Sequence, residues 1–145
     1  MRPFRITTLV ALLLASPSTL AAQDRSAVQQ SAREILRELI GINTDGDSGS
    51  TTAAAQALAK RLIAAGFAAQ DVSIVGPSSN PKNWNLVARY RGRGKAKPIL
   101  LMAHLDVVTA RPADWSIAPY ALTEKDGFLY GRGTSDQKNG CALLV

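Results

Sequence analysis

Two short segments decide the fold and the chemistry of this chain: Ala103-His104-Leu105-Asp106 and Gly131-Arg132-Gly133-Thr134-Ser135-Asp136-Gln137-Lys138. The first segment follows Ile99-Leu100-Leu101-Met102, an apolar run that predicts a central strand covered on both faces. Binding and catalytic residues of open α/β sheets lie at the carboxyl ends of strands, and His104 and Asp106 stand at such an end. Their spacing of two residues places both side chains on one face of the strand.

The second segment brings a further carboxylate to this place. Gly131 and Gly133 allow the backbone to pass close to whatever His104 contacts, and Asp136 opens a helix. Neutral imidazole is the commonest metal ligand, a neighbouring carboxylate fixes its tautomer, and another carboxylate can bridge two cations. These residue types favour a metal site. The alternative interpretation is that His104, the only histidine, is a hydrogen-bonded core residue and that Asp136 is only a helix N-cap.

Hydrophobic periodicity predicts helices and strands around the two segments. Helices are expected over residues 26–40 and from Thr51 or Thr52 to a stop at Gly66, and strands over residues 72–75 and 84–90. A turn over residues 92–97 is expected to return the chain antiparallel into the apolar strand, and Asp126-Gly127 predicts a hairpin. Helices combined with strands of mixed type indicate a layered α/β domain.

The first 22 residues have the pattern of a secretory signal peptide. Arg2 and Arg5 precede the apolar core Leu9 to Ala15, and small residues follow at Thr19 to Ala22. The apolar core is shorter than the ~20 residues that a membrane span needs, so we expect no stable membrane span after cleavage. The expected location is therefore secreted or periplasmic. The alternative is an uncleaved amphipathic anchor.

Composition argues against a nucleic-acid partner and against disulfides. The chain carries 17 basic and 11 acidic residues, and two of the basic ones lie in the predicted signal peptide, so the excess of positive charge is mild. The densest basic run, residues 89–97, includes two glycines, and a solvated turn explains it better than a nucleic-acid patch. Cys141 is the only cysteine, which excludes a disulfide within one chain.

The last residues of the chain suggest a longer protein. Gly140 to Val145 form an apolar, helix-compatible run without a cap or a polar tail. A complete domain seldom stops within a buried element. We therefore expect a signal peptide over residues 1–22 and, over residues 23–145, part of a longer protein.

A known family shares the ordered pattern of the two segments. The run from Leu101 to Val108, then Trp115, Pro119-Tyr120 and the run from Asp126 to Lys138 resemble the co-catalytic zinc peptidases and deacylases. That family includes acetylornithine deacetylase, succinyl-diaminopimelate desuccinylase, aminoacylase and glutamate carboxypeptidase. The resemblance implies that residues 23–145 are the N-terminal part of a catalytic metallopeptidase domain, a three-layer, mixed-sheet α/β domain of the zinc-peptidase type that is truncated at its C-terminal side. The lid and dimerisation domain, through which a homodimer could form, would be absent.

The resemblance also implies roles for residues and a cofactor. His104 would bind one zinc ion, Asp136 would bridge two, and Asp106 would be the catalytic-site carboxylate that orients His104. The peptide between Asp136 and Gln137 would be cis. The implied cofactor is Zn²⁺, two ions per site, with Co²⁺ as a substitute metal. Gln137 and Asn139 depart from residues common in the family, and neither position supplies a ligand.

The implied function belongs to the full-length protein. It is zinc-dependent hydrolysis of an amide bond in a peptide or an N-acyl amino acid by a two-metal site. The family's general base, in a Glu-Glu pair, and its remaining zinc ligands would lie beyond Val145. The alternative is a catalytically incomplete fragment or a non-catalytic binding module with the same fold.

Overall fold

The computed structural model describes the backbone from residue 18 and the side chains from residue 25 to the end of the chain at Val145. The apolar core of the predicted signal peptide lies outside these described residues, and the predicted cleavage stays a prediction. Among the helices of the described part, none combines the length and the apolar character that crossing a membrane requires.

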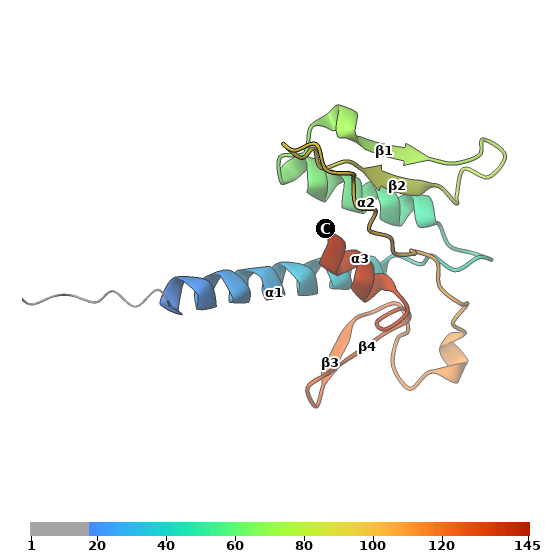
Figure 1. Cartoon of the computed structure of the whole chain (residues 1–145). Helices are drawn as coiled ribbons and strands as arrows, with labels where there is room; N and C mark the ends of the chain where they lie inside the picture. Colours follow the sequence, from blue (N-terminus) through green and yellow to red (C-terminus); the bar gives the residue numbers. More distant parts are fainter. Residues whose placement is uncertain (1–17) are drawn as a thin grey trace, which may run out of the picture.

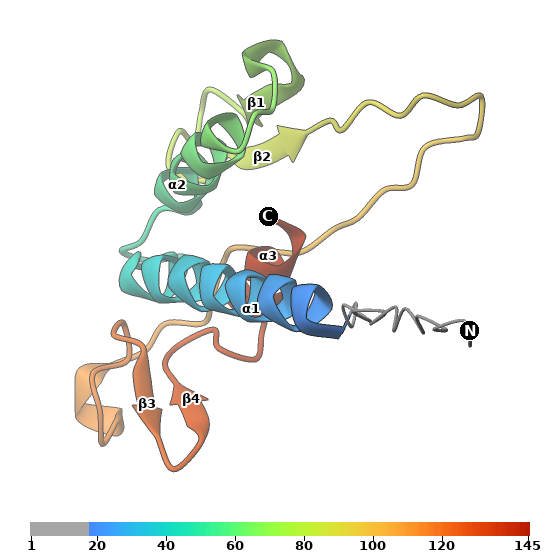
Figure 2. The same cartoon turned by 90° about the vertical axis from the view of Figure 1, so that its left-hand side faces the viewer.

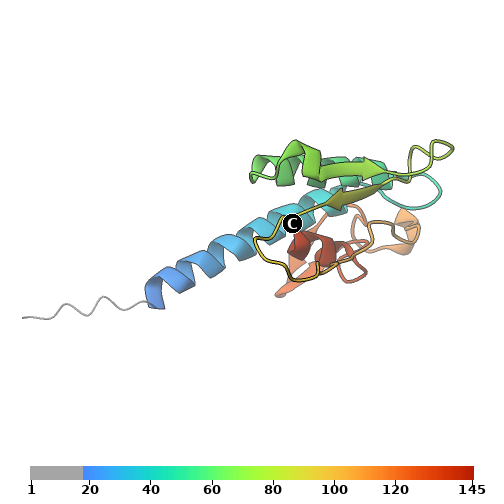
Figure 3. The ribbon, with the colours of Figure 1, turned by 45° about the horizontal axis from the view of Figure 1, so that its top comes forward.

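Helix α1 (Ser18–Gly41) is the longest element and begins before the predicted residue 26. Residues 18–40 contain neither proline nor glycine, so nothing in this stretch interrupts the helix. The N-terminal part of α1 projects from the rest of the molecule (Figure 3). Its last turns bury Leu36, Leu39 and Ile40, and helix α3 (Lys138–Leu144) packs on them (Figure 1).

Helix α2 (Thr51–Ala64) has well-defined caps at both ends. Its N-cap is Ser50, whose hydroxyl accepts a hydrogen bond from the Ala53 amide at 3.2 Å. Thr51 or Thr52 was the predicted N-terminal cap of this helix. The Thr52 hydroxyl does not cap the helix and donates instead to the Pro81 carbonyl at 2.7 Å. The predicted stop at Gly66 is confirmed, because this glycine has a φ of 100° and donates its amide hydrogen to the Ile63 carbonyl.

Four short strands form two separate antiparallel sheets. β1 (Val72–Val75) pairs with β2 (Asn85–Ala88) and both pack on α2, whereas β3 (Thr123–Lys125) pairs with β4 (Phe128–Tyr130). The predicted hairpin is present, with φ values of 53° at Asp126 and 79° at Gly127. The two sheets lie on opposite sides of α1 (Figure 2). Mixed helices and small sheets confirm the α/β class, as part of such a domain.

The apolar run Ile99–Met102 departs from the prediction. The chain that follows β2 forms a long extended loop (Figure 2), and within residues 18–145 no strand pairs with the apolar run. Its four side chains are 68% to 87% exposed. The predictions of a buried central strand and of an antiparallel return through residues 92–97 are therefore wrong for the described chain. An apolar run becomes a strand only where neighbouring backbone bonds to it, and none of the described backbone lies beside this one.

Candidate metal-binding site

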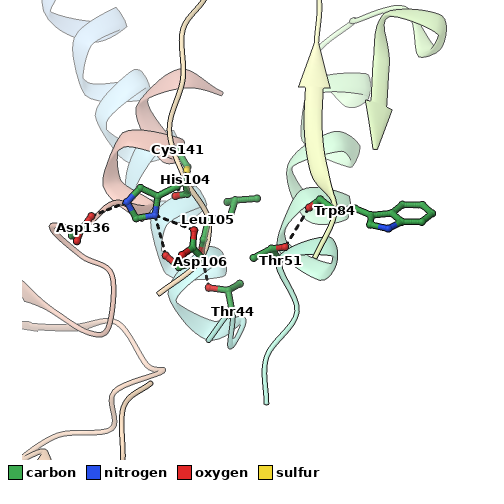
Figure 4. A network of polar contacts seen from close by, with 8 residues as sticks. All are labelled: Thr44, Thr51, Trp84, His104, Leu105, Asp106, Asp136 and Cys141. Carbon is green, nitrogen blue, oxygen red and sulfur yellow. Dashed lines mark hydrogen bonds and ion pairs between the residues drawn. The ribbon is translucent and has the colours of Figure 1, made fainter. Parts of the chain in front are cut away.

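The three residues singled out in the sequence line one pocket. The pocket has a volume of about 430 Å³, and His104, Asp106 and Asp136 lie in its wall together with Trp115 and Arg132. His104 and Asp106 come from the extended chain before Val107, whereas Asp136 comes from the loop before α3 (Figure 4). The fold therefore brings the two segments together, as predicted.

His104 and Asp136 contact each other directly. The distance from His104 Nε2 to Asp136 Oδ1 is 2.8 Å, across 32 residues of sequence (Figure 4). Their side chains are 46% and 82% exposed, so the contact is open to solvent. His104 is thus not the enclosed core histidine of the alternative interpretation.

Asp106 holds the other side of the imidazole ring. Its backbone carbonyl lies 3.1 Å from His104 Nδ1, and its carboxylate oxygen Oδ1 lies 3.4 Å away. The carboxylate was predicted to orient the ring, and the backbone carbonyl of the same residue is the nearer partner. Both partners of the ring, the Asp106 carbonyl at Nδ1 and the Asp136 carboxylate at Nε2, only accept hydrogen bonds, and a neutral ring has one proton to donate.

The contact between His104 and Asp136 therefore favours a positive charge. When the ring proton lies on Nδ1, the Nε2 lone pair faces a carboxylate oxygen, and two facing acceptors need a cation between them. Partial burial lowers the pKa of His104, but the hydrogen bonds to Asp136 and to the Asp106 carbonyl raise it by more, so the pKa lies above its ordinary value of 6.5. A proton fills the contact in this state, and a metal ion is the other cation that imidazole and carboxylate donors accept.

The donor set fits part of a metal site. One imidazole nitrogen and one carboxylate converge on the pocket, and both are donors that zinc accepts. Within residues 18–145, no group of three or more His, Cys, Asp or Glu side chains is arranged to hold a metal ion. The described residues therefore supply two donors, against about four ligands in a complete zinc site.

Asp136 does not cap the helix that follows it. The N-cap of α3 is Gln137, and no side chain forms a capping hydrogen bond there. The peptide between Asp136 and Gln137 is cis, as the family resemblance implied. The carboxylate of Asp136 is thus directed to His104, and the capping role of the alternative interpretation is not observed.

Hydrogen bonds fasten the segment of His104 to the loop after α1. The Thr44 hydroxyl donates to the Leu105 carbonyl at 2.6 Å, and the Val107 amide donates to the Thr44 carbonyl at 3.3 Å. Behind the ring, the Cys141 thiol lies 3.1 Å from the His104 carbonyl. Cys141 is a buried free thiol, and this contact joins it to the backbone of the His104 segment.

Asp45 is a buried carboxylate that the sequence did not single out. It is 2% exposed, its Oδ1 accepts from the amides of Asp47, Ser48 and Gly49, and its Oδ2 accepts from the Tyr120 hydroxyl at 3.0 Å. The amide hydrogen bond from Ser48 is the main reason why the pKa of Asp45 lies well below its usual range. Residues 43–50 have the composition of a loop, and Asp, Gly and Ser in such a stretch are a known signal for a turn.

Lys138 is a second buried charge that the sequence did not single out. Its side chain is 0% exposed, and its Nζ donates to the carbonyls of Leu39 and Ile42 at 2.8 Å each. Burial lowers the pKa of Lys138 from 10.5 to about 8. In the sequence, Lys138 stands two residues after Asp136 at a predicted helix start, where a polar residue is ordinary. No local pattern indicates that its side chain is buried.

Arg132 and Trp115 form one side of the pocket. The guanidinium carbon of Arg132 lies 5.0 Å from the centre of the Trp115 ring, a cation–π contact. The Arg132 amide donates to the Pro119 carbonyl at 2.7 Å. Trp115 therefore belongs to the same wall as Gly131 and Gly133, and Pro119 supports this wall through its hydrogen bond to Arg132.

Comparison with known proteins bears on this arrangement. Residues 100–145, which include both segments, match the model of peptidase family M20/M25/M40. This part of the chain is therefore similar to that family. The resemblance predicted from the sequence is therefore confirmed.

Relatives of the chain point to the same family. It is 43% identical over 92 residues to a succinyl-diaminopimelate desuccinylase of Azoarcus sp. (strain BH72), covering 62% of this chain and 22% of that protein. It is 52% identical over 48 residues to the N-fatty-acyl-amino acid synthase/hydrolase PM20D1 of Xenopus tropicalis, covering 33% of this chain and 9% of that protein. The chain thus spans less than a quarter of the length of these relatives.

Proposed function

We propose that the full-length protein is a zinc-dependent hydrolase of amide bonds, with a two-metal site to which this chain contributes His104 and Asp136. The observation that carries the proposal is the 2.8 Å contact between His104 Nε2 and Asp136 Oδ1, open to solvent in a pocket of about 430 Å³. Two facing acceptors of this kind fit a cation between them.

The residues of the chain have separate tasks in this proposal. His104 would offer Nε2 as a metal ligand with its ring proton on Nδ1, where the Asp106 carbonyl can accept it. Asp136 offers its carboxylate as the bridging ligand, and Asp106 orients the imidazole. Zinc, when bound, lowers the pKa of water to ~7 and polarises the carbonyl of the substrate. Co²⁺ is the substitute metal that we expect to support the same reaction.

The proposed substrates are N-acyl amino acids or peptides. The relatives are a desuccinylase and an N-fatty-acyl-amino acid synthase/hydrolase, whose names refer to acyl groups on amino compounds. Arg132 and Trp115 line the pocket beside the proposed ligands, so a cationic and an aromatic group are available for substrate contact. We expect substitutions at Arg132 or Trp115 to change the relative kcat/KM values for different substrates.

The proposed location is outside the cytoplasm. The charged start, the apolar core and the small residues up to Ala22 support cleavage by a signal peptidase. Sequencing the N-terminus of exported protein tests this, with Ala22 or Gln23 as the expected first residue. A membrane-bound product that retains Met1 contradicts the proposal.

The function itself is tested by metal content and hydrolysis in the full-length protein. We expect His104→Ala and Asp136→Asn each to lower bound zinc and to reduce kcat/KM by at least 100-fold, because a ligand is lost. Asp114→Asn is the matched control, since this exposed carboxylate pairs with Arg111 and does not line the pocket. Unchanged zinc and turnover in His104→Ala contradict the assignment. Substrate binding without hydrolysis in the wild type favours the non-catalytic binding module.

A further inference from the structure

Helix α1 ends without a cation of its own. The last turn of α1 contains no basic residue, and the final carbonyls of any helix lack partners within that helix. The end of α1 is also the negative end of its dipole, where a cation is stabilising. Lys138, which follows Leu39 by 99 residues, supplies this cation through its two hydrogen bonds to Leu39 and Ile42.

Burying the ammonium group of Lys138 costs folding free energy. An ammonium group at 0% exposure loses its water, and an apolar side chain would fill the same space without that cost. The two carbonyls at 2.8 Å offset part of the loss and fix the direction in which the side chain must run. A buried ammonium group with these two partners therefore favours one arrangement of the end of α1 and the loop before α3.

The loop that Lys138 fixes carries Asp136. The Lys138 amide donates to the Gly133 carbonyl at 2.9 Å, which closes the loop around Asp136. The Lys138 methylenes also contact Gly133, where an added Cβ would lie 3.1 Å from Cδ and 3.2 Å from Cγ. Asp136 therefore stands in a short closed loop that Lys138 ties to the end of α1 by two hydrogen bonds.

The segment of His104 is attached to the same place. Thr44, two residues after Ile42, donates its hydroxyl to the Leu105 carbonyl at 2.6 Å and is 1% exposed. Both partners of the contact between His104 and Asp136 are thus held by the end of α1 and the residues directly after it.

We infer that Lys138 is a positioning residue, which together with Thr44 uses the end of α1 to set the distance between His104 and Asp136. The inference rests on the proposed metal site, and it concerns residues that touch neither the metal nor the substrate. It also explains why a lysine follows Asp136 at a position with no solvent contact.

The first test needs no metal. His104 is the only histidine of the 145-residue chain, so the ¹⁵N resonances of its imidazole report one site. In Lys138→Met we expect these resonances to move toward those of Asp136→Asn, because the carboxylate is no longer held against Nε2. Thr44→Val should move them in the same direction while conserving volume.

The second test is zinc affinity, followed through the same resonances during titration with zinc alone. We expect Lys138→Met to weaken binding by about 10- to 100-fold, as is typical for residues behind a ligand. Leu62→Ala is the control, because this buried residue of α2 lies outside the core cluster that contains Leu39, Ile40 and Cys141. It should lower stability and leave both readouts unchanged.

The outcomes separate this inference from the proposed function. Unchanged His104 resonances in folded Lys138→Met overturn the positioning role, as does an equal change in Leu62→Ala. If Lys138→Met does not fold, unchanged resonances in Thr44→Val overturn it. A wild-type chain whose resonances ignore zinc counts against the proposed metal site, whereas the metal-free comparison still decides the role of Lys138.

Discussion

At the scale of single residues, a hydrogen-bonded carboxylate holds the loop that joins α1 to α2. The Asp45 carboxylate accepts hydrogen bonds from three backbone amides, the Ser48 hydroxyl and the Tyr120 hydroxyl, and its residue forms an isolated parallel bridge with Val107. Val107 follows His104 by three residues, so the support of Asp45 extends to the candidate site. An ionised carboxylate matches these donors because all five point to it.

The folding stability should therefore fall in acid through Asp45. Its folded pKa lies below the ordinary 3.8, so its contribution is present above pH 3.8 and is lost as the pH falls below that value. Asp45→Asn should lower the free energy of unfolding at pH 7 by about 2 kcal/mol and flatten the acid limb of the stability curve. Urea titrations between pH 2.5 and 7 measure both effects. An acid limb equal to that of the wild type shows that other groups carry it.

At the scale of elements, close backbone contact places the loop before α3. Gly133 has a φ of 91°, and an added Cβ would lie 2.9 Å from Val107 Cγ1. Gly127 in the hairpin has a φ of 79°, and nothing lies within 4 Å of an added Cβ. The two glycines share a conformation and differ in their surroundings.

Alanine at these two positions should separate conformation from contact. Gly127→Ala should cost about 1 to 2 kcal/mol of unfolding free energy, which is the cost of the left-handed region alone. Gly133→Ala should cost about 1 to 3 kcal/mol more, because Val107 and Lys138 must also move. Thermal unfolding of both variants measures the difference. Equal losses would mean that the approach of Gly133 to Val107 is not tight in solution.

At the scale of the whole molecule, the exposed apolar run is the most unusual surface. Ile99, Leu100, Leu101 and Met102 are consecutive and all at least 68% exposed, and extended apolar chain without a strand partner favours association with other chains. Val28 is a comparable exposed side chain, at 67%, but it stands on the projecting part of α1.

The 145-residue chain should therefore self-associate through residues 99–102. Replacing Leu100 and Met102 with lysine should shift the chain toward monomer, because charges on an extended edge oppose pairing. Val28→Lys is the control and should leave the association unchanged. Sedimentation velocity over a range of concentrations measures the distribution. A wild-type chain that stays monomeric at high concentration contradicts the prediction.

Short-range features of this protein were determined by the sequence itself. The turn at Asp126-Gly127 and the stop at Gly66 depend on neighbouring residues only, so local patterns predicted them. The two segments of the site were also predicted from residue types and order. The roles of His104, Asp106 and Asp136 stay predictions.

Tertiary structure decided what depends on residues far apart in the chain. The exposure of Ile99–Met102 follows from the absence of a partner strand among the described residues, which apolarity alone did not reveal. The burial of Lys138 follows from two carbonyls almost a hundred residues earlier, and the orientation of His104 follows from a backbone oxygen. Side-chain identity states what a residue can bond to, and the packing of distant segments selects which of those bonds forms.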